Sequence, residues 1–569
     1  MEDNKTISQE ELEQLMRDAE QGDAEAQYQL GKYYKKLVLW RYEEKSVYWY
    51  TKAAEQGHKN AQHDLGMIFL SDEEYKDWDK GISLLTQSAE QGCLSAMNVL
   101  GVEYDYCGEN KNAKYYEQAV FWFTKSAELN SSFGQRKLGL CYLHGCGVEQ
   151  NYEQAIYWIT KAAEQGDTEA QCSLGQCYAR GWGVETNLDV AFYWCAKAAE
   201  RGKATAQFNM GQYHYMYTQD YKQAAKWFTL AAKQGHMYAR HNLATLYYHG
   251  QGVRRNYKKA AGLFEKAAEQ GLVPAMSFIG QCYYFGKGVP CNMEKAVYWF
   301  SKAAEQGDAV AQYNLASCYE NGICVEQDVD KAVYWYTQAA EQGYAQAQFQ
   351  LGMCYDYGQG VEKDLHQAVH WYTLAAEQGF DDAQYHLGLC YSEGNGVEQD
   401  CTQAMYWWSK AAEQGNAEAQ HNLGYCYLEG EGVEKDEKTA IYWLTKAAEQ
   451  GDEEAQYGLG MYYSDVEDYE QAIYWYRKAV EQGNAGAQND LGYCYANGVG
   501  VEVDIEEALR LYRLSAEQGC DYAQLNLAEC YEQGRGVEQD LEQAIHWYTL
   551  AAEQGDEEAI EVLKRLNKG

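Results

Sequence analysis

The feature that most constrains the fold of this chain is a short string that returns about every 36 residues. The string is Ala-Ala-Glu-Gln-Gly or a close variant, and it ends at Gly22, Gly57, Gly92, Asn130, Gly166, Gly202, Gly235, Gly271, Gly307, Gly343, Gly379, Gly415, Gly451, Gly483, Gly519 and Gly555. A fixed period of this length indicates a repeat architecture rather than several unrelated domains. We therefore predict one repeat domain over residues 1–569, with a capping helix in 1–21, fifteen repeats in 22–555 and a second capping helix in 556–569.

Each unit predicts two helices joined by a tight turn, as the one that ends at Gly379 illustrates. From 345 to 357, small and apolar side chains share one helical face, which we name helix A. Gly358-Gln359-Gly360-Val361 supplies a turn, Asp364 is a ready N-cap, and a second helix, helix B, ends at Gly379. A helical hairpin of this size cannot bury its own apolar face, so successive hairpins must stack. The expected fold class is all-α, an α/α superhelical solenoid, and two prolines in 569 residues agree with unbroken helices.

The repeat has a specific consensus, Ala-x-Ala-Gln-x-x-Leu-Gly-x-x-Tyr-x-x-Gly-x-Gly-Val-x-x-Asp-x-x-x-Ala-x-x-Trp, as in residues 417–443. It resembles the Sel-one-like repeat family, a relative of the tetratricopeptide repeat. The resemblance implies a right-handed superhelix in which helix A lines a concave groove, and a role as a scaffold or adaptor for other proteins. A secreted, cysteine-rich branch staples its hairpins with disulfides, and a hydrolase activity toward β-lactams is suggested for it. The matching stretch here, residues 411–420, has no cysteine, which argues against that activity.

Charge and hydropathy exclude several kinds of partner. The chain has 47 Lys and Arg against 85 Asp and Glu, a net charge of −38, which opposes binding to nucleic acid or anionic lipid. We find no run of about 18 apolar residues and no apolar segment near the start, so we expect no membrane insertion and a cytoplasmic location. The oligomeric state does not follow from the sequence.

Candidate catalytic and metal sites have simpler structural interpretations. Nine cysteines recur three residues after the Leu of helix A, and we expect them to be small buried thiols, at Cys141, Cys177, Cys282, Cys318, Cys354, Cys390, Cys426, Cys494 and Cys530. His366 and His370 have the spacing of metal ligands, but His370 replaces a tyrosine of other units and is interpreted as a packing residue. We expect the loop aspartates to be N-caps rather than calcium ligands. The prediction is no enzyme, no cofactor and no metal.

Partner binding is a stronger candidate, because helix A has a second face that stacking does not use. Aromatic residues and Met alternate there with carboxylates, which suits a peptide with basic and apolar anchor residues. The predicted groove residues are Tyr313, Glu320, Phe349, Met353, Asp356, Tyr357, Tyr385, Leu389, Glu393, His421, Tyr425, Glu429, Tyr457, Met461 and Asp465. One alternative stays open, that these rings only pack against the adjoining helix A.

A basic stretch interrupts the acidic chain between Gly202 and Gly271. It has ten basic and three acidic residues, a net charge of +7. The simpler interpretation is a solvent-exposed basic face whose charge pairs with that of the acidic neighbouring repeats. The alternative is a second site for an acidic or phosphorylated partner, with Arg240, Arg254, Arg255, Lys258 and Lys259 as its residues.

We conclude from the sequence that the chain is a non-enzymatic scaffold or adaptor for protein or peptide partners. Two alternatives are a hydrolase, which requires carboxylates of raised pKa to converge in the groove, and a binder of acidic partners through residues 202–271.

Overall fold

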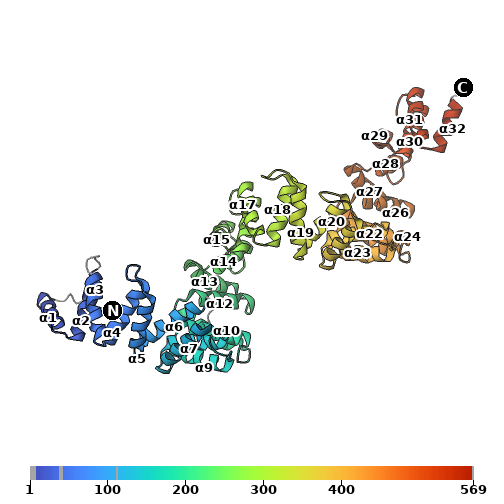
Figure 1. The fold of residues 1–569 in the computed structure, drawn as a ribbon. Coiled ribbons are helices and arrows are strands. Elements are labelled where there is room, and N and C mark those ends of the chain that lie inside the picture. Colours follow the sequence, from blue (N-terminus) through green and yellow to red (C-terminus); the bar gives the residue numbers. More distant parts are fainter. Residues whose placement is uncertain (1–7, 38–42, 110–112, 567–569) are drawn as a thin grey trace. The chain divides into compact units, whose positions relative to one another are not determined.

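A computed structural model describes residues 8–37, 43–109 and 113–566, and these residues form 32 α-helices and no β-strand (Figure 1). After α1, the even-numbered helices are the A helices of the repeats and the odd-numbered helices are the B helices. From α1 to α15, and again from α17 to α32, each helix packs on the next along the chain, as expected for stacked hairpins. The predicted all-α solenoid is confirmed.

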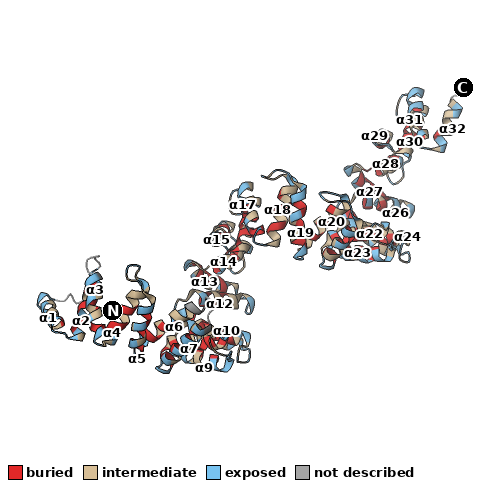
Figure 2. Cartoon of the chain, viewed as in Figure 1, coloured by how far each residue is buried: buried red, intermediate tan, exposed pale blue. Residues whose placement is uncertain are grey.

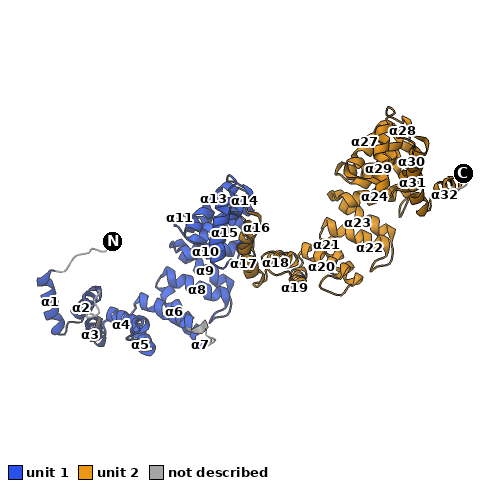
Figure 3. Ribbon diagram, turned by 90° about the horizontal axis from the view of Figure 1, so that it is seen from above, with its two compact units in different colours: residues 1–275, 287–290 blue, residues 276–286, 291–569 orange. Residues whose placement is uncertain are grey.

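Contacts divide the chain into two compact units (Figure 3), and the first comprises residues 1–275 and 287–290. Its helices are α1 (Gln9–Glu20), α2 (Ala24–Lys36), α3 (Glu43–Glu55), α4 (Lys59–Ser71), α5 (Trp78–Glu90), α6 (Leu94–Glu109), α7 (Ala113–Glu128), α8 (Ser132–His144), α9 (Tyr152–Glu164), α10 (Thr168–Arg180), α11 (Leu188–Glu200), α12 (Ala204–Met216), α13 (Tyr221–Lys233), α14 (Met237–His249) and α15 (Tyr257–Glu269).

The second unit comprises residues 276–286 and 291–569, so it begins within α16 (Val273–Phe285). Its further helices are α17 (Met293–Ala304), α18 (Ala309–Asn321), α19 (Val329–Glu341), α20 (Ala345–Tyr357), α21 (Leu365–Glu377), α22 (Asp381–Glu393), α23 (Cys401–Gln414), α24 (Ala417–Glu429), α25 (Glu437–Glu449), α26 (Glu453–Asp465), α27 (Tyr469–Gln482), α28 (Ala485–Asn497), α29 (Ile505–Glu517), α30 (Asp521–Gln533), α31 (Leu541–Glu553) and α32 (Glu557–Leu566).

The local sequence explains where the helices begin and end. Helix α20 spans the predicted residues and stops at Gly358, whose φ of 69° is in the left-handed region that glycine tolerates best. The Asp364 carboxylate then accepts the backbone N–H groups of His366 and Gln367 and caps α21. The predicted capping role is confirmed for all six loop aspartates, which are Asp328, Asp364, Asp400, Asp436, Asp504 and Asp540.

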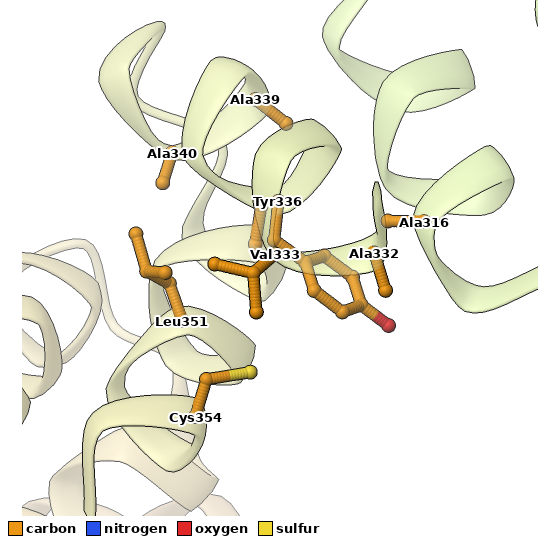
Figure 4. Close-up of a cluster of buried hydrophobic side chains, with 9 residues drawn as sticks. Ala316, Ala332, Val333, Tyr336, Ala339, Ala340, Leu351 and Cys354 are labelled. Carbon is orange, nitrogen blue, oxygen red and sulfur yellow. The ribbon is translucent and has the colours of Figure 1, made fainter. Parts of the chain in front are cut away.

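The core runs along the helices as a chain of small clusters (Figure 2). In one cluster, Tyr336 of α19 lies between Ala316 of α18 and Leu351 with Cys354 of α20 (Figure 4). The expectation of buried thiols is confirmed, because all nine helix A cysteines are at most 7% exposed. Burial raises the pKa of the Cys354 thiol to about 12, so this thiol is protonated at neutral pH.

A recurring pair of glutamines links successive units. Gln348 at the start of α20 donates its side-chain N–H to the carbonyl of Ala340 in the preceding helix B at 3.1 Å. Its side-chain oxygen accepts a hydrogen bond at 2.7 Å from Gln378, the residue that follows α21. The same pairing recurs between Gln312 and Gln342, Gln384 and Gln414, Gln420 and Gln450, and Gln524 and Gln554. We name this arrangement the glutamine ladder. It gives a second hydrogen-bond donor to carbonyl groups at the ends of the B helices, such as that of Ala340, which also accepts the backbone N–H of Gly343.

Helix α1 packs on α2, and the expected C-terminal helix, α32, packs on α31. Asp556 accepts the N–H of Ala559 and begins α32. No helix in the described parts of the chain combines the length and the apolar character that crossing a membrane requires. The assignment of all 569 residues to one continuous domain stays a prediction.

Candidate partner-binding surface

The aromatic rings predicted for the groove lie at the contacts between successive units. The Phe349 ring centroid is 5.8 Å from that of Tyr372 on its own helix B and 5.3 Å from that of Phe380, which precedes the next helix A. Tyr313 makes equivalent contacts, at 5.7 Å to Tyr336 and 5.4 Å to Tyr344. Both rings are half-buried. The alternative that the sequence left open, packing against the adjoining helix A, therefore describes these two rings.

The next units bury their rings in the same way but with polar partners. Tyr425 extends its hydroxyl over Gly458 of α26, where a Cβ atom would collide with it. His421 Nδ1 lies 2.9 Å from Asp452 Oδ1, the residue that caps α26. Although burial of Asp452 opposes ionisation, the hydrogen bonds from His421 and the backbone hold the pKa of its carboxyl below the ordinary value.

Two further predicted rings belong to this set. Tyr385 is half-buried, and its backbone carbonyl accepts the indole N–H of Trp408 at 3.2 Å. Tyr457 donates its hydroxyl to Asp490 Oδ2 at 3.2 Å, so it reaches from α26 to α28. Contacts with the next unit are made by Tyr313, Phe349, Tyr425 and Tyr457. All of these rings and that of Tyr385 are half-buried.

The predicted carboxylates occupy two different places at the end of helix A. Glu320 and Asp356 are the penultimate residues of α18 and α20 and are half-buried. Glu320 accepts the hydroxyl of the buried Tyr336 at 2.7 Å, and Asp356 accepts that of Tyr372 at 3.2 Å. Burial, together with the nearby carboxylate, raises the pKa of each tyrosine. These two carboxylates therefore complete the core, because they satisfy a hydroxyl that has no access to water.

The other three carboxylates are the last residues of their helices and are exposed. They are Glu393, Glu429 and Asp465. One further residue along an α-helix turns the side chain by about 100°, which moves these carboxylates away from the core. Their neighbours in the penultimate position are Ser392 and Leu428 in α22 and α24, where helix B has Trp408 or Leu444 in place of the tyrosine.

The apolar residues predicted for this surface also differ in exposure. Met353 is half-buried, and its sulfur lies 3.1 Å from the Tyr372 hydroxyl. Leu389 is half-buried as well, whereas Tyr357 is 60% exposed and Met461 is 38% exposed. We define the helix A face by the exposed predicted residues, which are Tyr357, Glu393, Glu429, Met461 and Asp465.

This face is hollowed between α26 and α28. A pocket of about 340 Å³ is lined by Met461 and Asp465, which were predicted, and by Asp490 and Tyr493, which were not. Asp490 stands directly before the Leu of helix A, where the adjacent units have Gly458 and Asn526. Other units have neutral or basic side chains there, except for Asp64 in an early repeat. An acidic residue in place of a neutral or imidazole side chain was the signal in the sequence that could have identified it.

A second exposed surface, which the sequence analysis did not consider, recurs on helix B. In Tyr-Trp pairs such as Tyr406 and Trp407, the rings meet edge-on at 5.0 Å, with the tryptophan buried and the tyrosine 49% exposed. The Lys410 amine lies 4.6 Å from the Tyr406 ring, a cation–π distance. His370 occupies the same position on α21, where it is exposed and its ring is 5.2 Å from that of Trp371. His370 therefore packs against Trp371, as a packing residue would, but it is exposed and does not belong to the buried core.

The predicted basic site is divided between a structural residue and a free surface. Arg240 takes the place of a glutamine in the glutamine ladder, donating to the carbonyl of Ala232 and to the Gln270 side chain. The remaining residues, Arg254, Arg255, Lys258 and Lys259, are exposed on the loop before α15 and on its first turn.

The described residues contain no group of three or more His, Cys, Asp or Glu side chains that could hold a metal ion. Three carboxyl groups have a raised pKa, mainly through burial, and they lie on three different helices, Asp382 on α22, Asp490 on α28 and Glu529 on α30.

The repeat units match a known family model along nearly the whole chain. The Sel1 repeat model matches residues 24–58, 59–93, 94–131, 132–167, 168–203, 204–236, 238–272, 273–308, 309–344, 345–380, 381–416, 417–452, 453–484, 485–520 and 521–556.

Two solved structures are similar to the chain. A protective antigen of uropathogenic Escherichia coli strains with an SLR fold is 33% identical, over 79% of this chain and 90% of that chain, with a TM-score of 0.60. A Sel1 repeat protein from Oxalobacter formigenes is 34% identical over 42% of this chain and 96% of that chain, with a TM-score of 0.40. A comparison with curated proteins gives no match.

Proposed function

Since the chain belongs to the Sel1 repeat family, we propose that it is a non-enzymatic scaffold that binds protein or peptide partners through the helix A face. The observation that carries the proposal is the exposure of the last residues of successive A helices, Tyr357, Glu393, Glu429 and Asp465, with Met461 exposed one turn earlier on α26. In the stack these helix ends repeat at regular intervals, so one extended ligand can reach several of them. Weak contacts to each unit then add up to a useful affinity.

The chemistry of this face favours a partner with basic and apolar anchor residues. Tyr and Met supply adaptable apolar contacts, and the three exposed carboxylates supply charge that attracts Lys or Arg. Most of the predicted rings are excluded from this role as primary anchors, since they hold neighbouring units together. A cytoplasmic location is part of the proposal, because the described cysteines are free thiols, as expected in a reducing compartment.

The proposal can be tested with a variant that alters the exposed residues and leaves the packed rings intact. The variant is Tyr357→Ser, Glu393→Gln and Glu429→Gln. We expect it to lose most partners that wild type captures in an affinity pull-down with crosslinking mass spectrometry, while its thermal unfolding is unchanged. A matched control is Tyr334→Ser, Tyr406→Ser and Tyr442→Ser, which alters equally exposed tyrosines of helix B. Equal loss of partners in both variants, or no loss in the first, would contradict the proposal.

A second candidate function is the binding of an acidic or phosphorylated partner by the basic loops of the first unit. The loop that contains Gly252 lies directly against the backbone of Tyr221 and Lys222 at the start of α13. This contact places the loop that carries Arg254 beside the first turn of α13, which carries Lys222. In the described structure, neither residue forms a salt bridge with a carboxylate.

This candidate differs from the first in its salt dependence. Reversing Arg254, Arg255, Lys258 and Lys259 to Glu is expected to abolish binding to a phosphorylated acidic peptide, and wild-type affinity should fall steeply as salt rises. Unchanged affinity after the four reversals would contradict it.

A further inference from the structure

The pocket between α26 and α28 has a composition unlike a simple gap between helices. Its wall is formed by Met461 and Tyr493, which are 38% and 53% exposed. Asp490 is half-buried beneath them, and Asp465 is exposed beside them. The pocket therefore has an apolar wall, one carboxylate inside and a second carboxylate at its entrance.

The short connection between α26 and α27 explains why Asp465 is at the entrance. The connection spans only Val466 to Asp468, and Glu467 takes a φ of 61° within it. Ser464 stands in the penultimate place that Asp356 occupies in α20, beside the buried Tyr476. Burial and the nearby charge of Asp490 raise the pKa of that tyrosine, and a hydrogen bond with Ser464 opposes the rise. Asp465 is thus not needed as a hydrogen-bond acceptor for the core.

Asp490 keeps its position through neutral donors alone. Tyr457 Oη donates to its Oδ2 at 3.2 Å, Asn489 Nδ2 donates to its Oδ1 at 3.0 Å, and the Tyr476 hydroxyl also hydrogen-bonds to this carboxyl. Burial nevertheless raises the pKa of this carboxyl, and no Lys or Arg contributes to the environment that sets it. A half-buried carboxylate in an open pocket without a cationic partner is electrostatically incomplete, because charges removed from water are normally paired.

We propose that this pocket binds one basic side chain, Lys or Arg, of a peptide that lies along the helix A face. The aliphatic part of the side chain packs against Met461 and Tyr493, and its charged head reaches Asp490, with Asp465 contributing at the entrance. Long basic side chains commonly divide their stem and head in this way. The inference rests on the proposed function, since it names the anchor point of the same ligand. It also distinguishes this repeat from its neighbours, which have no acidic residue at the position of Asp490.

The test uses the full-length chain and synthetic probes. One array holds 12-residue peptides with a central lysine between leucines in an alanine and serine background, and a matched array has norleucine in place of lysine. The affinity of the best pair is then measured by fluorescence polarisation. We expect wild type to prefer the lysine peptide by about tenfold or more, the range of one hydrogen bond to a charged group. A diazirine beside the lysine is expected to crosslink to Met461 or Tyr493.

Asp490→Asn is expected to remove the preference for lysine, and the change is mild because an asparagine occupies this position in other units. Glu481→Gln on α27, an exposed carboxylate outside the pocket, is the matched control and should keep the preference. A lysine preference that survives Asp490→Asn overturns the pocket.

The pocket and the proposed function can fail separately. One outcome is that peptides of both arrays bind wild type but no longer bind the Tyr357, Glu393 and Glu429 variant, while Asp490→Asn keeps the lysine preference. The helix A face is then correct and the pocket is wrong. If neither array binds, or if binding is insensitive to both variants, the pocket and the helix A face are both overturned.

Discussion

Helices α18 and α20 end differently from α22 and α24, although all four follow the same repeat pattern. In the first pair the acidic residue is penultimate and accepts the hydroxyl of a buried tyrosine from helix B. In the second pair it is the final residue and faces solvent, and helix B has Trp408 or Leu444 instead of tyrosine. In these four units, the carboxylate is bound to the core when helix B supplies a tyrosine hydroxyl, and it is free to bind a ligand when helix B has Trp or Leu at that position.

The same pairing occurs once more near the end of the second unit. Glu532 is penultimate in α30 and accepts the hydroxyl of the buried Tyr548 at 2.8 Å. In α16 the penultimate residue is Tyr284, and the corresponding buried residue of α17 is Phe300, which has no hydroxyl. The pairing is not universal, because the buried Tyr512 of α29 faces Ala496 at the penultimate position of α28. Where a penultimate carboxylate does accept a buried hydroxyl, it spares the cost of an unsatisfied polar group.

The largest effect is expected from Asp356→Ala, which leaves the Tyr372 hydroxyl buried without its carboxylate partner. The local free energy of unfolding at α20 and α21 should fall by about 1–3 kcal/mol, measured by hydrogen exchange and mass spectrometry on the full chain. Glu393→Ala removes an exposed carboxylate and should change local stability by about 0.5 kcal/mol or less. Adding Tyr372→Phe to Asp356→Ala should recover part of the loss. Equal losses for the two single variants would break the comparison.

A smaller, pH-dependent effect is expected at Asp452, which caps α26 and accepts a hydrogen bond from His421. Since its pKa is lower in the folded state, the carboxylate stabilises the fold above the unfolded pKa, and this contribution disappears as pH falls through the folded pKa. Protection of α26 should therefore decrease on the order of 1 kcal/mol under acid. Asp452→Asn should lack this dependence, and a wild type without it would contradict the assignment.

The opposite sign is expected at Asp490, whose folded pKa is raised by burial. The folded state binds this proton more tightly than the unfolded state, so stability falls as pH rises from the unfolded to the folded pKa and stays reduced above it. Asp490→Asn should accordingly increase the hydrogen-exchange protection of α28 at pH 7. The gain should be smaller than the loss in Asp356→Ala, and it should shrink in acid. A loss of protection at pH 7 would show that the carboxylate stabilises the fold.

The smallest difference is expected for the cysteines behind these helix ends. Cys354 and Cys390 are 5% and 7% exposed, and burial raises the pKa of each thiol to about 12. Both should resist iodoacetamide under native conditions, while the exposed Cys291 and Cys324 react. Equal protection of Cys354 and Cys390 would show that the regions around α20 and α22 differ only at the surface and share the same core packing. Rapid labelling of only one would place it in the core.

Much of this fold follows from the sequence, because the residues of each repeat set the bounds, the caps and the buried face of its own two helices. The bounds of α20, the N-cap at Asp364 and the burial of the helix A cysteines depend on residues within one unit or on its nearest neighbour. Since repeats contact only adjacent repeats, these local signals also determine the stacked core.

The site depended on information that a period cannot supply. Spacing along helix A treated Phe349 and Tyr357 as members of one surface, but contacts with the next unit bury part of Phe349 and leave Tyr357 exposed. Arg240 looked like part of a basic site, and only its bonds to Ala232 and Gln270 reveal its place in the glutamine ladder.

The sequence by itself therefore determined the family, the helices and the chain of small cores. The tertiary structure decided which polar groups are already used and which are available, including Asp490 in its pocket. The physical reason is that availability depends on the distance to a partner in another helix and on access to water, and neither quantity is encoded in the position of a residue within its own repeat.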